Sequence, residues 1–336
     1  MMTKPLVSIL IPFKNVDEYF EECLKSIQNQ TYNIWEVIAV NDNSSDDSLA
    51  IAKTFAANDA RFKIYSNEES GIITALRKAY AHSSGNSITR MDADDHMSPE
   101  RIEVMVNSLV QQGKGSLAVG KVKYFSKAGV NDGYDRYEKW LNKLTATGDN
   151  FKEIYKECVI PSPCWMVHKE NFEASDAFNP NRYPEDYDLA FRFYEIGLKC
   201  IPCTTTLHYW RDYNNRTSRT SEHYAQNYFL DIKLHYFLKL EYKTIDNLVV
   251  WGAGKKGKKI ANLLVEKNIP FQWVCDNEKK IGKDIYGIRL THFSNLKESK
   301  NSKTIITVAN EDDQNMIKSF FKELEQKPSV DYFFFC

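Results

Sequence analysis

The first third of the chain alternates short apolar runs with segments whose apolar residues recur every three or four positions. The runs have the length of buried strands and lie at residues 6–12, 35–40, 62–65 and 87–91. The intervening segments have helical spacing and lie at residues 19–27, 48–57 and 72–82. Strands that alternate with helices at this interval predict an α/β fold with a largely parallel sheet.

The pattern becomes less regular after Leu117 and resumes towards the end of the chain. Residues 183–188 introduce a helical pattern at 189–196, which ends at Gly197. Residues 224–242 predict a long helix, and residues 248–251 predict a strand that runs into a glycine-rich turn. We therefore expect a first domain at 1–222, a linking helix at 223–244 and a second domain at 245–336.

The predicted helix at 224–242 carries an aromatic and aliphatic face. Its members recur at spacings of three and four and are Tyr228, Phe229, Ile232, Tyr236, Phe237 and Leu240. Packing between the two domains is the favoured use of this face, while peripheral contact with the inner face of a membrane stays open. A homo-oligomer is likewise an open alternative.

Composition narrows the classes of partner. A formal net charge of -1 over 336 residues creates no overall field that attracts nucleic acid, so we expect no nucleic-acid partner. All apolar runs are too short to cross a bilayer, so no transmembrane segment is expected. Seven cysteines and no signal-peptide pattern favour the cytoplasm.

Three carboxylates follow the strand-like run at 87–91, namely Asp92, Asp94 and Asp95. Such closely spaced charges repel one another unless a cation lies among them. A divalent cation shared with a phosphate oxygen would satisfy this need, whereas an acidic turn before the helix near Ser98 is the alternative. Asp42 also falls at the end of a predicted strand, and the ends of parallel strands share one edge, which favours an active site.

Six short segments, in this order, resemble the family 2 glycosyltransferases, which share the GT-A fold. They lie at residues 7–15, 26–31, 41–48, 71–72, 90–101 and 185–189. The resemblance implies a GT-A nucleotide-diphospho-sugar transferase fold over residues 5–220, with a mixed, mostly parallel sheet flanked by helices. A small Rossmann-like α/β domain would follow it.

The resemblance also implies roles for individual residues. Asp186 would be the catalytic base, and Asp94 would hold Mn²⁺ or Mg²⁺ at the donor diphosphate. Asp42 would accept a hydrogen bond from the nucleobase and Asp92 would hold the ribose. The full set implied for binding the nucleotide sugar is Pro12, Lys14, Asp42, Gly71, Arg90, Asp92, Ala93 and Arg211.

Elementary chemistry agrees with these roles. A departing nucleoside diphosphate carries negative charge that a cation stabilises, and the attacking hydroxyl must lose a proton to a base. One base implies single displacement with inversion. The alternative for Asp186 is that it merely caps its helix.

The chain departs from the family pattern in two places. Lys14 stands where an aromatic residue is common, so charge would replace stacking on the base. In the segment at 208–213 no histidine occupies the position where many members have one, because His208 lies upstream of it, which leaves the metal ligands beyond Asp94 undefined. The Gln-x-x-Arg-Trp signature of processive synthases is absent, so one sugar per encounter is expected.

A second glycine-rich sequence, Gly252-x-Gly254-x-x-Gly257, follows the strand at 248–251, and Asp276 ends another predicted strand at 271–275. This pattern is typical of a dinucleotide-binding turn. Too few residues follow for both halves of a NAD site. Three interpretations stay open: a second nucleotide site, a phosphate-loop shape without a ligand, and a packing or dimerisation module.

We therefore predict an inverting, metal-dependent enzyme of the hexosyltransferase type, which transfers one sugar from a nucleotide-diphosphate sugar. The acceptor would be a saccharide or a lipid-linked hydroxyl in cell-surface polysaccharide or glycoconjugate synthesis. The alternatives are a catalytically silent nucleotide-sugar-binding protein and a sugar-phosphate nucleotidyltransferase.

Overall fold

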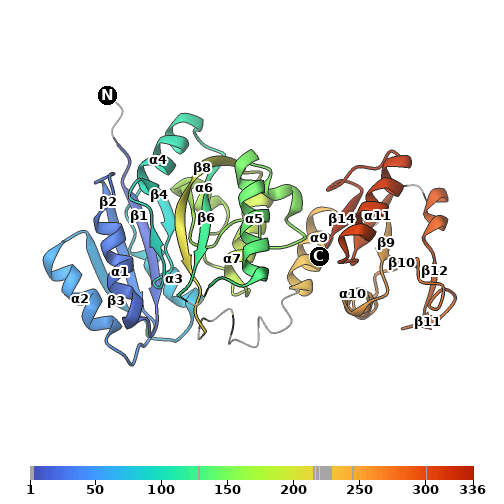
Figure 1. Ribbon diagram of the computed structural model, residues 1–336, viewed down its shortest axis with the longest axis horizontal. Coiled ribbons are helices and arrows are strands. Elements are labelled where there is room, and N and C mark those ends of the chain that lie inside the picture. Colours follow the sequence, from blue (N-terminus) through green and yellow to red (C-terminus); the bar gives the residue numbers. More distant parts are fainter. Residues whose placement is uncertain are drawn as a thin grey trace. The chain divides into compact units, whose positions relative to one another are not determined.

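The computed structural model describes residues 4–127, 129–214, 216, 219, 229–243, 246–299 and 301–336. The chain divides into two compact units, and Figure 1 labels most of their helices and strands. The first unit consists of Met1–Phe151 and Cys158–Arg216, and the second of Lys152–Glu157 and Thr217–Cys336. The second unit thus takes in a short segment from the middle of the chain. The expected domain boundaries at 222 and 244 stay a prediction.

The first unit is built on an eight-stranded sheet with the strand order β3-β2-β1-β4-β7-β6-β8-β5. Its strands are β1 (Val7–Phe13), β2 (Trp35–Asn41), β3 (Phe62–Ser66), β4 (Ser87–Arg90), β5 (His96–Met97), β6 (Ser116–Phe125), β7 (Trp165–His168) and β8 (Lys199–Arg211). Its helices are α1 (Asp17–Gln28), α2 (Ser48–Asn58), α3 (Ile72–Ala81), α4 (Arg101–Gln112), α5 (Asp132–Thr147), α6 (Lys169–Ala174) and α7 (Glu185–Glu195), and the 3₁₀ helix η1 (Asn150–Glu153) follows α5.

The sheet is mixed, as predicted. Strands β1 to β4 form a parallel group, and β6 pairs in parallel with β8. Strand β7 runs antiparallel to both β4 and β6 and so joins the two parallel parts. Because β2, β1 and β4 are neighbours and parallel, their carboxyl ends lie along one edge of the sheet. We call this edge, with the side chains described below, the carboxylate rim.

Side-chain alternation along β1 explains the layers. Ile9 and Ile11 belong to the hydrophobic core that α1, α2 and α4 complete on one face of the sheet. Leu10 is equally buried but lies outside that cluster, and α3 packs against β1 and β2. Helices therefore cover both faces, which is why the central strands read as nearly continuous apolar runs.

The second unit has a six-stranded sheet with the order β11-β12-β10-β9-β13-β14. Its strands are β9 (Asn247–Trp251), β10 (Gln272–Cys275), β11 (Asp284–Ile285), β12 (Ile288–His292), β13 (Ser302–Ile306) and β14 (Tyr332–Phe334). Its helices are α9 (Leu230–Leu240), α10 (Lys255–Glu266) and α11 (Glu311–Glu323), with the 3₁₀ helix η3 (Phe293–Glu298). All neighbours are parallel except β11 and β12.

This strand order starts at β9 in the centre and proceeds outwards first through β10 and then through β13. It is the order of a doubly wound sheet, which changes direction between β9 and β13. Helix α11 packs on the sheet face that carries Trp251, with Phe321 in the same core. Helix α10 packs against β9 and α9, and right-handed crossovers place it on the opposite face from α11.

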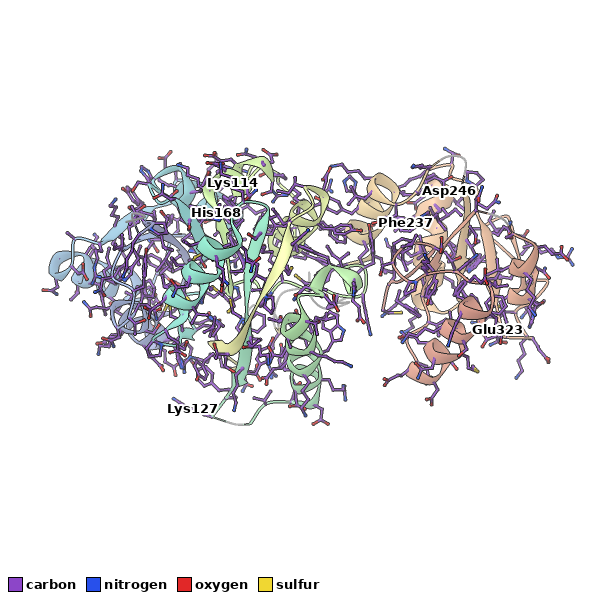
Figure 2. All side chains as sticks on the ribbon, turned by 90° about the horizontal axis from the view of Figure 1, so that it is seen from above. Lys114, Lys127, His168, Phe237, Asp246 and Glu323 are labelled. Atoms are coloured by element: carbon purple, nitrogen blue, oxygen red, sulfur yellow. The ribbon has the colours of Figure 1, made fainter. Side chains whose placement is uncertain are left out.

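The predicted aromatic helix is shorter than expected in the part that the structure describes. Helix α9 spans Leu230–Leu240, and Tyr228, the first residue of the predicted apolar face, lies outside the described residues. Phe237, labelled in Figure 2, lies with its ring 5.2 Å from that of Phe333 and 5.9 Å from that of Tyr155. Tyr155 belongs to the short segment of the second unit, so this aromatic cluster helps to hold the segment there. Nowhere in the described chain is a helix both long and apolar enough to cross a membrane.

Candidate active site

The carboxyl ends of β1 and β2 bring Lys14 and Asp42 together. Asp42 Oδ1 accepts hydrogen bonds from the Asn67 side-chain amide, at 2.9 Å, and from the Gly71 backbone N–H, at 2.8 Å. Asp42 Oδ2 lies 3.4 Å from the Lys14 ammonium. Gly71 adopts a φ of 143°, which favours glycine over any other residue. The Asp42 carboxylate is therefore fixed, with Oδ2 directed to Lys14.

Two other residues predicted for the nucleotide sugar belong to the scaffold of this rim. Pro12 lies inside β1, opposite Val40 in the register with β2. Ala93 is 4% exposed and its methyl group packs in the core. A contact between Ala93 and a donor would therefore come from its main chain.

Arg90, the last residue of β4, joins the two acidic segments of the sequence. Its Nε donates to Asp92 Oδ1 at 3.0 Å, and its Nη1 donates to Glu185 Oε1 at 2.8 Å. Arg90 is 5% exposed, so both ion pairs are formed away from bulk water. Segments about a hundred residues apart in sequence are thereby joined through one guanidinium.

Asp186 lies in the first turn of α7, next to Glu185. Its Oδ1 accepts a hydrogen bond from the Tyr187 backbone N–H at 2.8 Å, as an acid at a helix N-terminus can. Burial raises the pKa of Asp186 to about 7, the charge of Glu185 adds to the rise, and the charge of Arg90 opposes it. A carboxylate with a pKa near neutrality is suited to accept a proton at physiological pH.

Asp94 faces the segment that follows β8. Its Oδ2 accepts a hydrogen bond from the Tyr213 hydroxyl at 3.0 Å. Burial, and then the charge of Asp95, raise the pKa of Asp94 to about 7, whereas the charge of Arg216 lowers it. The structure thus surrounds this carboxylate with a hydroxyl donor and a cation from the same segment.

Arg211 holds the main chain of the acidic run. Its Nε donates to the Asp94 carbonyl oxygen at 2.8 Å, and its Nη2 donates to the Glu22 carboxylate. The guanidinium lies 4.6 Å from the ring centroids of both Tyr19 and Phe125, which cover it. Its predicted contact with the donor diphosphate stays a prediction.

Asp95 belongs to a fully buried polar network. Its Oδ2 lies 3.0 Å from His208 Nε2, and its Oδ1 accepts from the Arg211 backbone N–H at 2.7 Å. Arg101 Nη1 lies 3.0 Å from His208 Nδ1. Since arginine can only donate, Nδ1 accepts and the proton of neutral His208 sits on Nε2, directed to Asp95. Burial, followed by the charge of Arg101, holds the pKa of His208 well below its usual range.

Sequence reasoning missed several members of this site. Asn67 follows β3 directly, so the rule that selects Asp42 at the end of β2 would have found it. The pairing of Arg101 with His208 and of Glu22 with Arg211 joins distant segments, and no local pattern indicates it.

The donor set is compatible with a divalent cation held mainly by the substrate. Among the residues that the structure describes, no three His, Cys, Asp or Glu side chains form a metal-binding group. Mg²⁺ and Mn²⁺ commonly take one or two carboxylates and complete their shell with phosphates and water. Asp94 could provide one such carboxylate oxygen, Oδ1, while Tyr213 bonds to Oδ2.

The glycine turn of the second unit uses each glycine differently. Gly252 has a φ of 119°, and a Cβ at Gly257 would lie 2.0 Å from the Gly252 carbonyl oxygen. A Cβ at Gly254 would meet no atom within 4 Å. Asp276 is exposed just beyond β10. The first and third glycines are therefore required by the fold, while Gly254 leaves open space at the start of α10.

Comparisons with known proteins agree with the predicted family. A family model described as glycosyl transferase family 2 matches residues 8–175. Glycosyltransferase GlyA of Streptococcus pneumoniae is 26% identical over 231 residues, which cover 65% of this chain and 32% of GlyA. The chain spans about a third or less of the length of the first curated relatives that it matches.

Two solved structures show the same fold at low sequence identity. S. aureus TarS 1–349 in complex with UDP-GlcNAc aligns with a TM-score of 0.53 and 17% identity, over 77% of this chain and 71% of that one. Mannosyltransferase PcManGT from Pyrobaculum calidifontis, in complex with GDP-Man and Mn²⁺, aligns with a TM-score of 0.50 and 20% identity, over 71% and 64%. The predicted GT-A-like α/β fold is confirmed. With a family match over half of its length, the chain belongs to glycosyl transferase family 2.

Proposed function

We propose that the carboxylate rim transfers a single sugar from a nucleotide-diphosphate sugar to an acceptor hydroxyl, with inversion at the anomeric carbon. The observation that carries the proposal is the connection of Asp92 to Glu185 through Arg90. It supports the proposal because it joins Asp92, the carboxylate proposed for the donor side, to the start of α7, which carries Asp186. The proposed setting is the synthesis of cell-surface polysaccharide or glycoconjugate, where the acceptor is a saccharide or a lipid-linked hydroxyl.

Each part of the rim has a task in this reaction. Asp42 and Lys14 would hold the base, and Asp92 would hold the ribose. Asp186 would accept the proton of the acceptor hydroxyl as its oxygen bonds to the anomeric carbon. The bond from that carbon to the diphosphate oxygen breaks, and the leaving nucleoside diphosphate keeps the electron pair. A divalent cation beside Asp94 would supply electrostatic stabilisation of that leaving charge.

The similar structures suggest which donors to test first. TarS was solved with UDP-GlcNAc, and PcManGT with GDP-Man and Mn²⁺. In both donors the base has a ring N–H that lies between carbonyl or amino groups. Asp42 Oδ2 could accept a hydrogen bond from this N–H. We therefore begin with UDP-sugars and GDP-sugars, each with and without Mn²⁺.

The decisive experiment has two steps. A thermal-shift screen of UDP-, GDP-, CMP- and dTDP-sugars, with and without Mn²⁺, identifies the donor. Transfer to acceptor sugars is then followed by chromatography, and NMR defines the anomer of the product. A product with inverted configuration supports the proposal, and a retained one refutes the single-displacement mechanism. Donor binding without transfer would indicate a silent binding protein, and pyrophosphate release from a nucleoside triphosphate and a sugar phosphate would indicate a nucleotidyltransferase.

Metal dependence needs its own variant. Asp94→Ala should remove the part of donor affinity that depends on Mn²⁺, because Asp94 would help to hold the cation that stabilises the diphosphate charge. Isothermal titration calorimetry with and without Mn²⁺ measures it. Equal donor affinity of the two proteins in the presence of Mn²⁺ would contradict the role of Asp94.

We also propose that the glycine turn of the second unit, Gly252 to Gly257, takes a phosphate-bearing ligand. The open space at Gly254 supports this proposal. Lys255 and Lys256 support it too, because they lie in the first turn of α10, at the positive end of the helix dipole. The turn lies at the carboxyl end of β9, next to the point where the strand order reverses. Backbone amide shifts of this turn on addition of pyrophosphate or ADP test the proposal, and unchanged shifts would refute it.

A further inference from the structure

Arg90 is the one guanidinium among the described residues that the structure records in ion pairs with both acidic segments of the rim. One edge, formed by Nε and Nη2, lies 3.0 Å from Asp92 Oδ1. The remaining nitrogen, Nη1, lies 2.8 Å from Glu185 Oε1. All three of its nitrogens therefore point to protein carboxylates rather than to open space.

Burial makes these contacts strong and costly to break. The side chains of Arg90 and Glu185 are 6% and 8% exposed, so removal of one partner leaves the other charge buried and uncompensated. The Asp92 side chain is more open, at 18% exposed. Arg90 has little surface left for direct contact with a donor, in contrast to the role that the sequence predicts.

We propose that Arg90 is a positioning residue for the transfer reaction, which fixes Asp92 on the donor side relative to Glu185 and Asp186 on the acceptor side. The inference rests on the proposed function, because it assigns Asp92 to the donor and Asp186 to the acceptor proton. The guanidinium acts through these carboxylates and not through the substrate. It sets the separation across which the acceptor oxygen must approach the anomeric carbon.

The proposal has an electrostatic consequence with a definite sign. Among the described residues, the charges that act most strongly on Asp186 are those of Glu185 on α7 itself, Arg90 on β4 and Asp92 in the segment after β4. Arg90 favours the ionised form of Asp186 and lowers its pKa, whereas Glu185 disfavours that form and raises it. A base acts when it is ionised, so the acid limb of the pH profile of kcat follows this pKa. Loss of Arg90 should move the limb to higher pH, and loss of the Glu185 charge should move it to lower pH.

The test therefore compares Arg90→Gln, Arg90→Lys and Glu185→Gln. Arg90→Gln should lower kcat at pH 7 by about tenfold to a hundredfold, with partial recovery at higher pH, while the donor Kd rises less. Arg90→Lys keeps the charge but not the two-sided contact, so the acid limb should stay in place and kcat should recover in part. In Glu185→Gln the new amide oxygen can still accept a hydrogen bond from Arg90 Nη1, so the protein should still fold. The acid limb should move to lower pH, because the charge of Glu185 is lost.

Arg192 provides a matched control. Like Arg90, Arg192 is nearly buried, but it lies on α7. Its Nε donates to Asp188 Oδ2 at 2.8 Å. Arg192→Gln should lower the melting temperature with little movement of the acid limb, because Arg192 is not among the largest causes of the shift in the pKa of Asp186.

Distinct outcomes separate this inference from the proposed function. If wild-type protein transfers no sugar from any donor, the proposed function fails. If wild type is active but Arg90→Gln and Glu185→Gln leave the acid limb unmoved, or move it in the same direction, the positioning role fails. A rise in donor Kd that equals or exceeds the fall in kcat in Arg90→Gln would instead make Arg90 a donor-binding residue. Should Arg90→Gln not fold, the shift in Glu185→Gln decides.

Discussion

The two units carry their candidate sites at the same topological position but build them from different groups. In the first unit, the carboxyl ends of parallel strands carry buried polar side chains such as Arg90, which forms an ion pair with Glu185, and Asp95, which accepts a hydrogen bond from neutral His208. In the second unit, the carboxyl end of β9 leads into a glycine turn, and Lys255 beyond it is exposed. Charge that is buried must be oriented by its partners, whereas exposed charge is screened and free to rotate.

The difference indicates what each site can do. Proton transfer and the stabilisation of a leaving group need charges at fixed positions, and the buried pairs of the first unit provide them. Backbone N–H groups and exposed lysines suit the binding of an anion but supply no fixed base. We therefore assign chemistry to the first unit and, at most, ligand binding to the second.

The largest effect that would test this contrast is expected for Asp186→Asn. The amide keeps the shape of the side chain but cannot accept the acceptor proton, so kcat should fall by about 10²- to 10⁴-fold. Donor affinity should remain within about threefold, because a general base on the acceptor side contributes little to donor binding. Transfer kinetics and calorimetry measure the two quantities. Strong loss of donor affinity would move Asp186 out of the base role and leave only its position at the start of α7.

The next largest effect is expected on the unfolding free energy of the first unit, when one of its buried charges is removed. Arg101 is 0% exposed and its Nη2 donates to Thr89 Oγ1 and to the Arg90 carbonyl oxygen. Arg101→Met removes these bonds and the donor to His208, which should lower the unfolding free energy of the first unit by about 3–5 kcal/mol. Thermal melts followed by tryptophan fluorescence measure the change.

Lys25→Met is the control for this variant, because Lys25 is 59% exposed and pairs with Glu21 on the surface of α1. It should melt close to wild type. If Arg101→Met does the same, the buried network does not stabilise the rim, and the contrast between the two units weakens.

Much of the fold could be predicted because its signals are local. The strand predicted at residues 35–40 is β2, Trp35–Asn41, and the helix predicted at 72–82 is α3, Ile72–Ala81. The apolar runs that mark strands and the glycines that end helices depend on residues close in sequence. They can therefore be recognised without knowing which segments pack together. By contrast, the assignment of Lys152–Glu157 to the second unit depends on contacts such as the stacking of Tyr155 on Phe335, 5.5 Å apart, which no local pattern encodes.

The candidate site shows the same difference between local signals and contacts over long sequence distances. Asp42 and Asp94 can be selected from sequence as candidates because each follows a strand in a short acidic motif, and their roles stay predictions. The contacts that orient them cannot be selected in this way, since the Asn67 amide and the Tyr213 hydroxyl approach from other elements. Arg211 is a further example. Its predicted diphosphate contact stays a prediction, and no local pattern indicates that Tyr19 and Phe125 lie against its guanidinium.

The smallest effect on stability, and the sharpest test of the second site, is expected for Gly254→Ala. A Cβ at Gly254 meets nothing within 4 Å and the residue has a φ of -78°, so the unfolding free energy should change by less than about 1 kcal/mol. If the turn binds a phosphate-bearing ligand, the added methyl occupies the space that the ligand needs, and the affinity for pyrophosphate or ADP should fall by about tenfold. Gly257→Ala is the matched control, because its Cβ would lie 2.0 Å from the Gly252 carbonyl oxygen and should destabilise the second unit by about 1–3 kcal/mol. Amide chemical shifts of the turn and thermal melts separate the two effects. A Gly254→Ala protein that binds these anions as tightly as wild type does would show that the ligand does not occupy the open space at Gly254, and the proposed site at this position would be wrong.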